Sequence, residues 1–276
     1  MNYTEAILLG IIQGLTEFLP VSSSGHLVLF QHLFGLKEAE LFFDVCVHLG
    51  TLLAVIIVFR QEIKNIIFAM MRLLSSTGPK KSALQKIESD PDLKLALLIV
   101  IGSIPTAVLG LMFHNIADRL FSSPFFTGLM LMVTGLLLWL TRRANTGAGG
   151  TNIEGFSRTK AFVIGSVQGL AMIPGISRSG STISIGLLLG INRETAARYS
   201  FLLSIPAIVG AGLLSLKDSL SETDPVIWLS LWGAAAAALV GYTALKVLLG
   251  LVKKGHLHLF APYCWLVGIL AIVLSW

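Results

Sequence analysis

Charged side chains are scarce in this chain of 276 residues. Asp, Glu, Lys and Arg make up 13% of the sequence, whereas 54% of the residues are hydrophobic. Soluble domains carry about twice that share of charge, because a wettable exterior needs it. The composition therefore excludes a soluble enzyme, a nucleic-acid-binding protein and a disordered protein. It predicts an all-α polytopic membrane protein, whose partners would be membrane lipids and not nucleic acid.

Cysteine is also scarce, and the start of the chain lacks basic residues. The two cysteines, Cys46 and Cys264, both lie in apolar runs, where we expect free buried thiols instead of a disulfide. No Lys or Arg precedes Lys37, and Glu5 and Glu17 interrupt the first apolar run. A cleavable signal peptide is therefore not expected.

Long apolar runs are abundant, and they fall into two kinds. A membrane-crossing helix needs about 20 apolar residues. Six runs have close to this length: 41–59, 93–113, 124–141, 196–216, 226–250 and 260–276. Two others, 4–36 and 159–191, are each interrupted by a polar turn that begins near Pro20 or Pro174. Irregular backbone is tolerated at membrane depth only where it lines a cavity or is buried in protein. We expect both to be re-entrant helical hairpins.

The two interrupted segments are similar to each other. When the first is shifted by 155 residues, 11 of the 32 positions 4–35 are identical in the second without a gap. We therefore expect one integral membrane domain, 1–276, that holds repeat one at 1–145 and repeat two at 155–276. Each repeat would contain one hairpin and three spans. Because three is odd, the second repeat would start from the opposite side of the membrane, which makes an inverted-topology repeat.

The basic residues predict the orientation. The loops 60–92, 142–160, 192–198 and 246–258 carry 15 of the 20 Lys and Arg residues, whereas 36–40, 114–123 and 217–225 carry only Lys37, Arg119 and Lys217. Loops rich in Lys and Arg stay in the cytoplasm. Both termini would then lie outside, and the two hairpins would enter from opposite sides and meet inside the bilayer.

The polar turns of the hairpins supply the side chains expected to carry the chemistry. Arg178 is the one Lys or Arg well inside an apolar segment, where a charge is costly and marks a functional candidate. The second half-helix of each hairpin would point its N-terminus into the bilayer, which favours an anion. Hydroxyls and the guanidinium fork suit phosphate oxygens. The candidate site comprises Gln13, Glu17, Ser22, Ser23, Ser24 and His26 with Ser177, Arg178, Ser179 and Thr182.

Glu17 and His26 indicate more than anion binding. A carboxylate beside a phosphate site often holds a divalent cation, and His26 is suited to be a general acid or base, or a nucleophile. Simpler interpretations stay open: Ser22 and Ser177 as helix N-caps, Arg178 as a structural partner of Glu17, and His26 as a core histidine.

A second pair of polar residues lies in the span 41–59. Asp44 and His48 are four residues apart and therefore share a helix face. The sequence leaves open whether they support the site or serve helix-end and polar packing.

Two stretches of the sequence resemble a known family. Residues 13–26 (QGLTEFLPVSSSGH) and 174–182 (PGISRSGST) are similar to the signature motifs of bacterial undecaprenyl-diphosphatases of the bacitracin-resistance type. Those motifs are (Glu/Gln)-x-x-x-Glu with a downstream His, and Pro-Gly-x-Ser-Arg-Ser-x-x-Thr. The resemblance spans the chain and implies hydrolysis of undecaprenyl diphosphate to undecaprenyl phosphate and inorganic phosphate. This reaction recycles the lipid carrier for cell-wall synthesis and confers bacitracin resistance.

The resemblance also implies roles for the site residues. Glu17, with Gln13 at the variable Glu/Gln position, would bind a divalent metal, Mg²⁺ or Ca²⁺, and Arg178 would bind the diphosphate. Ser23 or His26 would be the nucleophile or its base. Phosphate would also be bound by Ser22, Ser24, Ser177, Ser179 and Thr182. The site would face the periplasmic side of the bacterial cytoplasmic (inner) membrane and take a polyprenyl diphosphate lipid; a homo-oligomer is left open.

A transporter or flippase is the alternative. Inverted repeats with broken helices that meet at midplane are a transporter architecture, and the same anion site would suit a phosphorylated lipid or solute. The pair Glu17 and His26 favours catalysis, because simple binding needs neither. Release of phosphate distinguishes the two functions.

Overall fold

The computed structural model describes residues 1–35, 41–75, 83–114, 120, 123–144, 150–218 and 224–275. In these ranges the fold is helical apart from an isolated β-bridge between Thr151 and Ile191. Lys37, Lys80, Lys81 and Arg119, on which the predicted orientation partly rests, lie outside the described residues. The helices are α1 (Tyr3–Phe18), α2 (Ser23–Leu33), α3 (Leu41–Val58), α4 (Arg60–Ser75), α5 (Ala83–Ser89), α6 (Pro91–His114), α8 (Pro124–Leu140), α9 (Arg158–Leu170), α10 (Arg178–Leu188), α11 (Arg193–Asp218), α12 (Asp224–Lys253) and α13 (Ala261–Leu274), with short 3₁₀ turns at Thr141–Arg143, Ile153–Gly155 and Leu257–Phe260.

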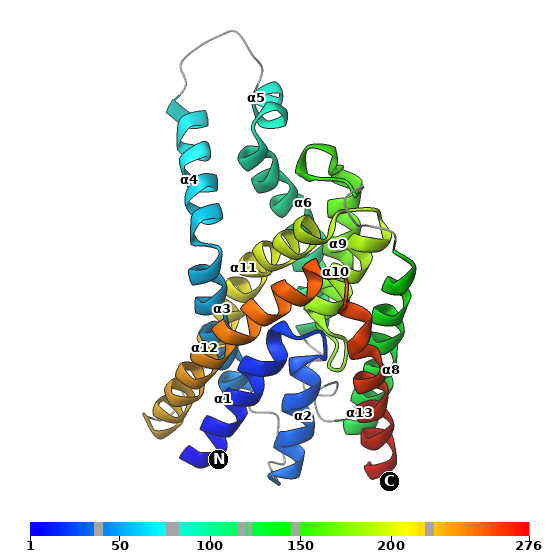
Figure 1. Cartoon of the computed structure of the whole chain (residues 1–276). Helices are drawn as coiled ribbons and strands as arrows, with labels where there is room; N and C mark the ends of the chain where they lie inside the picture. Colours follow the sequence, from blue (N-terminus) through cyan, green and yellow to red (C-terminus); the bar gives the residue numbers. More distant parts are fainter. Residues whose placement is uncertain are drawn as a thin grey trace.

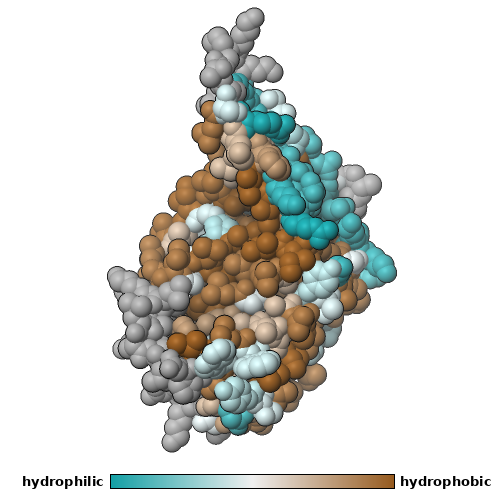
Figure 2. Space-filling view, turned by 90° about the vertical axis from the view of Figure 1, so that its left-hand side faces the viewer, coloured by the Kyte–Doolittle hydropathy of each residue, from teal (hydrophilic) through white to brown (hydrophobic). Residues whose placement is uncertain are grey.

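The long helices confirm a polytopic membrane protein. Among the described residues, five segments are long and apolar enough to cross a membrane, and the number is six if α3 and α4, which meet at a 76° bend, are counted as one span. The segments include α6, α8, α11, α12 and α13, where the sequence predicted spans. Figure 2 shows hydrophobic side chains over much of one face, and exposed apolar residues such as Leu239 at 76% fit contact with lipid.

The segment 60–92, which we expected to be a loop, is largely helical. It forms α4 and α5, and α6 begins at Pro91. Charges at the start of α4 interrupt the apolar run. However, Ile63 and Ile66 pack on the main apolar cluster, a set of buried residues that includes Phe18 and Phe201, and Ala69 is buried. The helix α4 is therefore amphipathic, since it buries one apolar face and carries its charges on the other. The described basic residues of this segment, Arg60, Lys64, Arg72 and Lys86, therefore lie on helices. The helices α4 and α5 are at one end of the molecule, and both termini lie at the other (Figure 1).

Local signals explain where the hairpin helices begin and end. Asn2 caps α1, since its side chain accepts a hydrogen bond from the Glu5 N–H at 3.0 Å while Glu5 accepts one from the Asn2 N–H at 2.8 Å. The helix α1 ends at Phe18, two residues before Pro20. Ser22 and Ser177 cap α2 and α10. The bounds of α2 and α10 differ by 155 residues at both ends, which is the shift that aligns the two segments.

Close helix contacts hold the hairpins in place. The helix α1 packs on α12, and α9 packs on α6. A Cβ at Gly10 would overlap the carbonyl oxygen of Gly233, and one at Gly165 would overlap that of Gly102. Gly10 and Gly165 are equivalent under the 155-residue shift. The contact of α1 with α12 and the contact of α9 with α6 therefore each require a glycine at the same position of the repeated segment. The main apolar cluster, which includes Phe18 and Phe201, connects the two halves of the chain.

Candidate functional site

The turns of the two hairpins touch each other. The Ser179 hydroxyl donates a hydrogen bond to the Phe18 carbonyl oxygen at 3.0 Å. A Cβ built at Gly25 would lie 3.1 Å from the Gly175 Cα, so the backbones approach closely. This contact joins residues about half the chain apart, as the sequence predicted.

Two helices outside the hairpins fix these turns at equivalent positions. Thr134 on α8 donates to the Gly175 carbonyl oxygen at 2.7 Å and accepts from the Ser177 N–H at 3.0 Å. Cys264 on α13 donates to the Pro20 carbonyl oxygen at 3.6 Å. Pro20 and Gly175 are themselves 155 residues apart, so each turn is held by a side chain from the last helix of the other half. Both cysteines are free thiols, as expected, but only Cys264 is buried, and Cys46 is half-buried.

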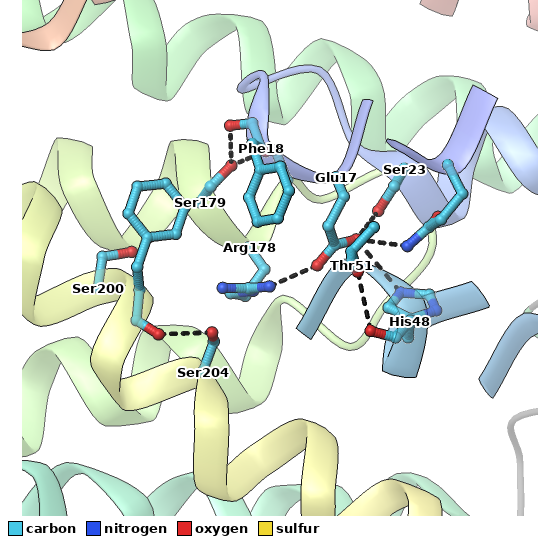
Figure 3. Close-up of polar contacts among 12 residues, drawn as sticks. Glu17, Phe18, Ser23, His48, Thr51, Arg178, Ser179, Ser200 and Ser204 are labelled. Carbon is cyan, nitrogen blue, oxygen red and sulfur yellow. Dashed lines mark hydrogen bonds and ion pairs between the residues drawn. The ribbon is translucent and has the colours of Figure 1, made fainter. Parts of the chain in front are cut away.

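Glu17 is the centre of the polar contacts (Figure 3). Its Oε1 accepts a hydrogen bond from Arg178 Nη2. Its Oε2 accepts from Ser23 Oγ at 2.6 Å and Gln13 Nε2 at 2.8 Å, and it lies 3.4 Å from His48 Nε2. The Glu17 side chain is 4% exposed. The two oxygens therefore divide their partners: one faces the second hairpin, and the other faces the first hairpin and α3.

Arg178 keeps part of its donor capacity. The guanidinium forms the ion pair with Glu17 that the structural interpretation anticipated, and it is 16% exposed. Its Nη1 is buried with no hydrogen-bond partner among the described residues. Arg178 is the first residue of α10, so this donor lies at a helix N-terminus. A buried, unpaired guanidinium nitrogen there is suited to an oxyanion.

The backbone just before Ser23 is strained. Ser22 has φ of 68°, a left-handed conformation that is costly for a residue other than glycine. Its side chain caps α2 by accepting from the Gly25 N–H at 3.2 Å, and it lies 3.4 Å from the Ser24 hydroxyl. Such strain persists where the surrounding structure enforces it, often at functional sites. Here it precedes the serine that contacts Glu17.

His26 does not join the Glu17 contacts. Its Nδ1 is 2.8 Å from the Ser22 carbonyl oxygen, and its Nε2 is 2.8 Å from the Tyr263 hydroxyl. The rings of His26 and Tyr263 also stack, with centroids 5.8 Å apart. Because a carbonyl only accepts, Nδ1 carries the proton in this arrangement and Nε2 accepts from Tyr263. Both ring nitrogens are therefore engaged away from Glu17 and Ser23.

The hydroxyls of the second hairpin hold the start of α10. Ser177 accepts from the Gly180 N–H at 3.1 Å, which is the N-cap interpretation. Thr182 Oγ1 donates to the Arg178 carbonyl oxygen at 2.7 Å or hydrogen bonds with Ser200 Oγ at 2.5 Å. These contacts orient the helix that carries Arg178.

Three residues near the site were not among the ten residues of the candidate site, although His48 had been considered as a supporting residue. His48 contacts Glu17, Tyr263 contacts His26, and Thr134 fixes the second turn. Only His48 had a sequence signal, its spacing of four from Asp44. The other two lie on apolar helices without a distinguishing pattern.

The donors near Glu17 fit a divalent cation in part. Gln13 Oε1 is buried without a hydrogen-bond partner among the described residues, although the amide nitrogen of the same side chain contacts Glu17. A carboxylate and an orphan amide oxygen are ligands that hard cations accept. No group of three His, Cys, Asp or Glu side chains that could hold a metal is found among the described residues. Substrate oxygens and water would have to complete the coordination.

Comparisons with known proteins identify the family. Residues 6–270 match the family described as "Bacitracin resistance protein BacA". A relative from Desulforapulum autotrophicum, named "Undecaprenyl-diphosphatase", is 52% identical over 273 residues, which is 99% of this chain and 98% of the relative. A protein of the same name from Desulfosudis oleivorans is 54% identical over 97% of this chain and 97% of the relative. Another from Halothermothrix orenii is 46% identical over 100% of this chain and 99% of the relative. The chain therefore belongs to the BacA family of bacitracin resistance proteins.

Proposed function

We propose that this protein hydrolyses undecaprenyl diphosphate to undecaprenyl phosphate and inorganic phosphate, which recycles the lipid carrier for cell-wall synthesis and confers bacitracin resistance. The observation that carries the proposal is the continuous contact of Ser23, Glu17 and Arg178, in which the buried Glu17 carboxylate joins two part-buried side chains. It supplies a hydroxyl, a carboxylate that can take its proton, and a guanidinium with an unpaired donor. Relatives that are up to 54% identical carry the enzyme's name.

Ser23 is the nucleophile in this proposal. Its hydroxyl is 2.6 Å from Glu17 Oε2, within the reach of a nucleophile and its base. His26, the other candidate, has both ring nitrogens engaged by Ser22 and Tyr263. His26 then acts in the second step, where Tyr263 must release Nε2 before it can contact a water.

The reaction is balanced over two steps. Ser23 Oγ bonds to the terminal phosphorus while Glu17 takes the hydroxyl proton, and the bridging P–O bond breaks to release undecaprenyl phosphate. Water then bonds to the phosphoserine phosphorus and gives one proton to His26 Nε2, while the P–Oγ bond breaks and Glu17 returns its proton to Ser23 Oγ. These changes release inorganic phosphate and restore the Ser23 hydroxyl. Arg178 Nη1 meets the charge that spreads over the transferring oxygens, and the N-terminal N–H groups of α10 add to it.

A divalent metal, Mg²⁺ or Ca²⁺, would be held by Glu17 with the amide oxygen of Gln13. It would supply charge neutralisation at the diphosphate. Ser22, Ser24, Ser177, Ser179 and Thr182 contribute mainly by fixing the turns and helix starts, since most of their contacts are to the protein itself.

The membrane arrangement that suits this chemistry is an inverted-topology repeat. Repeat one at 1–145 and repeat two at 155–276 each hold a re-entrant hairpin and three spans. Support comes from the matched bounds of α2 and α10, from the paired contacts at Gly10 and Gly165, and from the matched turn contacts of Thr134 and Cys264.

The site then opens to the periplasmic side of the bacterial inner membrane, with both termini outside. The opposite end, where α4 and α5 lie (Figure 1), belongs to the segment 60–92, which carries six of the 20 Lys and Arg residues and is expected in the cytoplasm. A polyprenyl tail can remain in lipid while its diphosphate enters a site recessed into the membrane.

Phosphate release from a long-chain prenyl diphosphate by the purified protein in detergent tests the function. We expect release with Mg²⁺ or Ca²⁺, and its loss in Glu17→Ala. The matched control is Glu5→Ala, a carboxylate on the exposed start of the same helix. Lipid that is bound or moved across vesicles without any release of phosphate would contradict the enzyme and support the transporter.

A further inference from the structure

His48 is a histidine near the proposed catalytic residues that the mechanism leaves unused. It lies on α3, and its Nε2 is 3.4 Å from Glu17 Oε2. The His48 side chain is 29% exposed, whereas that of Glu17 is 4% exposed, so the imidazole lies between the buried carboxylate and an accessible space. Figure 3 shows the ring directed at Glu17.

The hydrogen bond on the other side of the ring defines what Nε2 can do. His48 Nδ1 is 2.7 Å from the Asp44 carbonyl oxygen, and a carbonyl can only accept, so Nδ1 carries a proton. In the neutral ring Nε2 then presents a lone pair toward the carboxylate oxygen. Metal-binding histidines have this arrangement, because the other ring N–H is usually donated to a backbone carbonyl or a carboxylate.

The spacing of the two atoms fits neighbouring ligands of one cation. Ligands about 2.0–2.2 Å from a metal, at angles between about 90° and 110°, lie about 3.0–3.5 Å from each other. The 3.4 Å between Nε2 and Oε2 falls in this interval. The orphan Oε1 of Gln13 belongs to a side chain that already contacts the same carboxylate oxygen.

His48 is held by contacts at both ends of its turn. Asp44, whose carbonyl anchors the ring, also accepts from Gln31 Nε2 of α2 at 2.7 Å through its side chain. Thr51 Oγ1 donates to the His48 carbonyl oxygen at 2.8 Å. The ring is therefore oriented relative to the first hairpin before any ligand arrives.

We propose that His48 Nε2 and Glu17 Oε2 are adjacent ligands of the divalent cation used by this protein. The inference rests on the proposed function, and it adds a nitrogen ligand from α3 to the oxygen ligands of the first hairpin. Imidazole nitrogen suits Mn²⁺, Co²⁺ and Zn²⁺ better than Mg²⁺ or Ca²⁺. The site therefore binds Mn²⁺ more tightly than a site made only of Gln13 and Glu17 oxygens would.

Pulsed electron paramagnetic resonance of bound Mn²⁺ tests this directly, since it detects the nitrogen of a coordinated imidazole. With the full-length protein in detergent, we expect ¹⁴N modulation in the wild type and its loss in His48→Gln, with Mn²⁺ affinity reduced by about tenfold or more. His256→Gln, at an exposed position before the turn 257–260, should keep both. Comparison of elution profiles and melting temperatures checks that each variant is folded.

The outcomes distinguish a failure of the assignment of His48 as a metal ligand from a failure of the proposed function. Wild-type protein that does not bind Mn²⁺, that binds it without ¹⁴N modulation, or that keeps the modulation after His48→Gln overturns the proposal. If phosphate release persists in those cases, only the ligand assignment fails. If the modulation depends on His48 but the wild type releases no phosphate, the metal site stands and the proposed function fails.

Discussion

Arg178 and Glu17 form an ion pair across the two hairpin turns, although 161 residues separate them in the sequence. The pair places opposite charges within a largely apolar protein, where each partner keeps the other from being an unpaired buried charge. One guanidinium nitrogen and one carboxylate oxygen are used by the pair. Arg178 Nη1 and Glu17 Oε2 are left for other partners, and this division underlies the proposed chemistry.

Replacement of Arg178 tests whether phosphate release needs the two terminal nitrogens of the guanidinium in addition to its charge. Arg178→Lys retains a cation but cannot both pair with Glu17 and donate from a second nitrogen. We expect kcat for phosphate release to fall by about 10²–10³-fold, as when one transition-state donor is removed. Arg158→Lys, an exposed arginine that pairs with Glu88 at 2.7 Å, is the matched control and should retain full activity. Equal effects of the two changes would mean that Arg178 has no special role.

Ser23 and Ser22 are neighbours with different predicted roles. Ser23→Ala removes the hydroxyl that contacts Glu17, so phosphate release and any trapped phosphoserine should disappear while the melting temperature changes little. Ser22→Ala removes the cap of α2 and should cost about 0.5–2 kcal/mol of stability, but leave a measurable rate. Rates come from the phosphate assay and stability from thermal unfolding. Phosphoserine formation that survives Ser23→Ala would contradict the assignment of the nucleophile.

The glycines at the helix contacts give a prediction for stability. Gly10→Ala and Gly165→Ala each place a Cβ against a carbonyl of the facing helix, so each should destabilise the protein by about 1–3 kcal/mol. Gly210→Ala, inside α11 with open space around it, should be neutral or stabilising because alanine favours a helix. Thermal unfolding in detergent measures all three. If Gly10 tolerates alanine as well as Gly210, the close packing of α1 on α12 is wrong.

Cysteine labelling in intact cells tests the orientation. Single cysteines near residue 150 should react only with reagents that reach the cytoplasm, and cysteines at either terminus should react from outside. The background variant lacks both native thiols, of which Cys264 is buried and Cys46 half-buried. Termini that label from opposite sides would exclude the inverted repeat.

Much of this architecture follows from local sequence signals. The breaks at Pro20 and Pro174, the serine caps and the 155-residue shift locate α2 and α10, and the shared motif residues bring the two turns into one candidate site. These features depend on neighbours in the chain, which sequence patterns report well.

Other features depend on contacts between distant segments. The sequence did not predict α4, because its burial against the core only becomes visible when α6 lies beside it. Tyr263 is 237 residues from His26, and its ring lies on a helix with no polar pattern. His26 was expected among the catalytic groups, and its engagement with Tyr263 could be found only from the folded arrangement.

Hydrolysis in ¹⁸O-labelled water tests the central claim most directly. If water completes the reaction at the terminal phosphorus, mass spectrometry should find the label in inorganic phosphate and none in undecaprenyl phosphate, and Glu17→Gln should release neither product. Label in undecaprenyl phosphate would contradict the account. Recovery of the lipid as intact diphosphate after incubation with the wild-type protein and metal would contradict it as well.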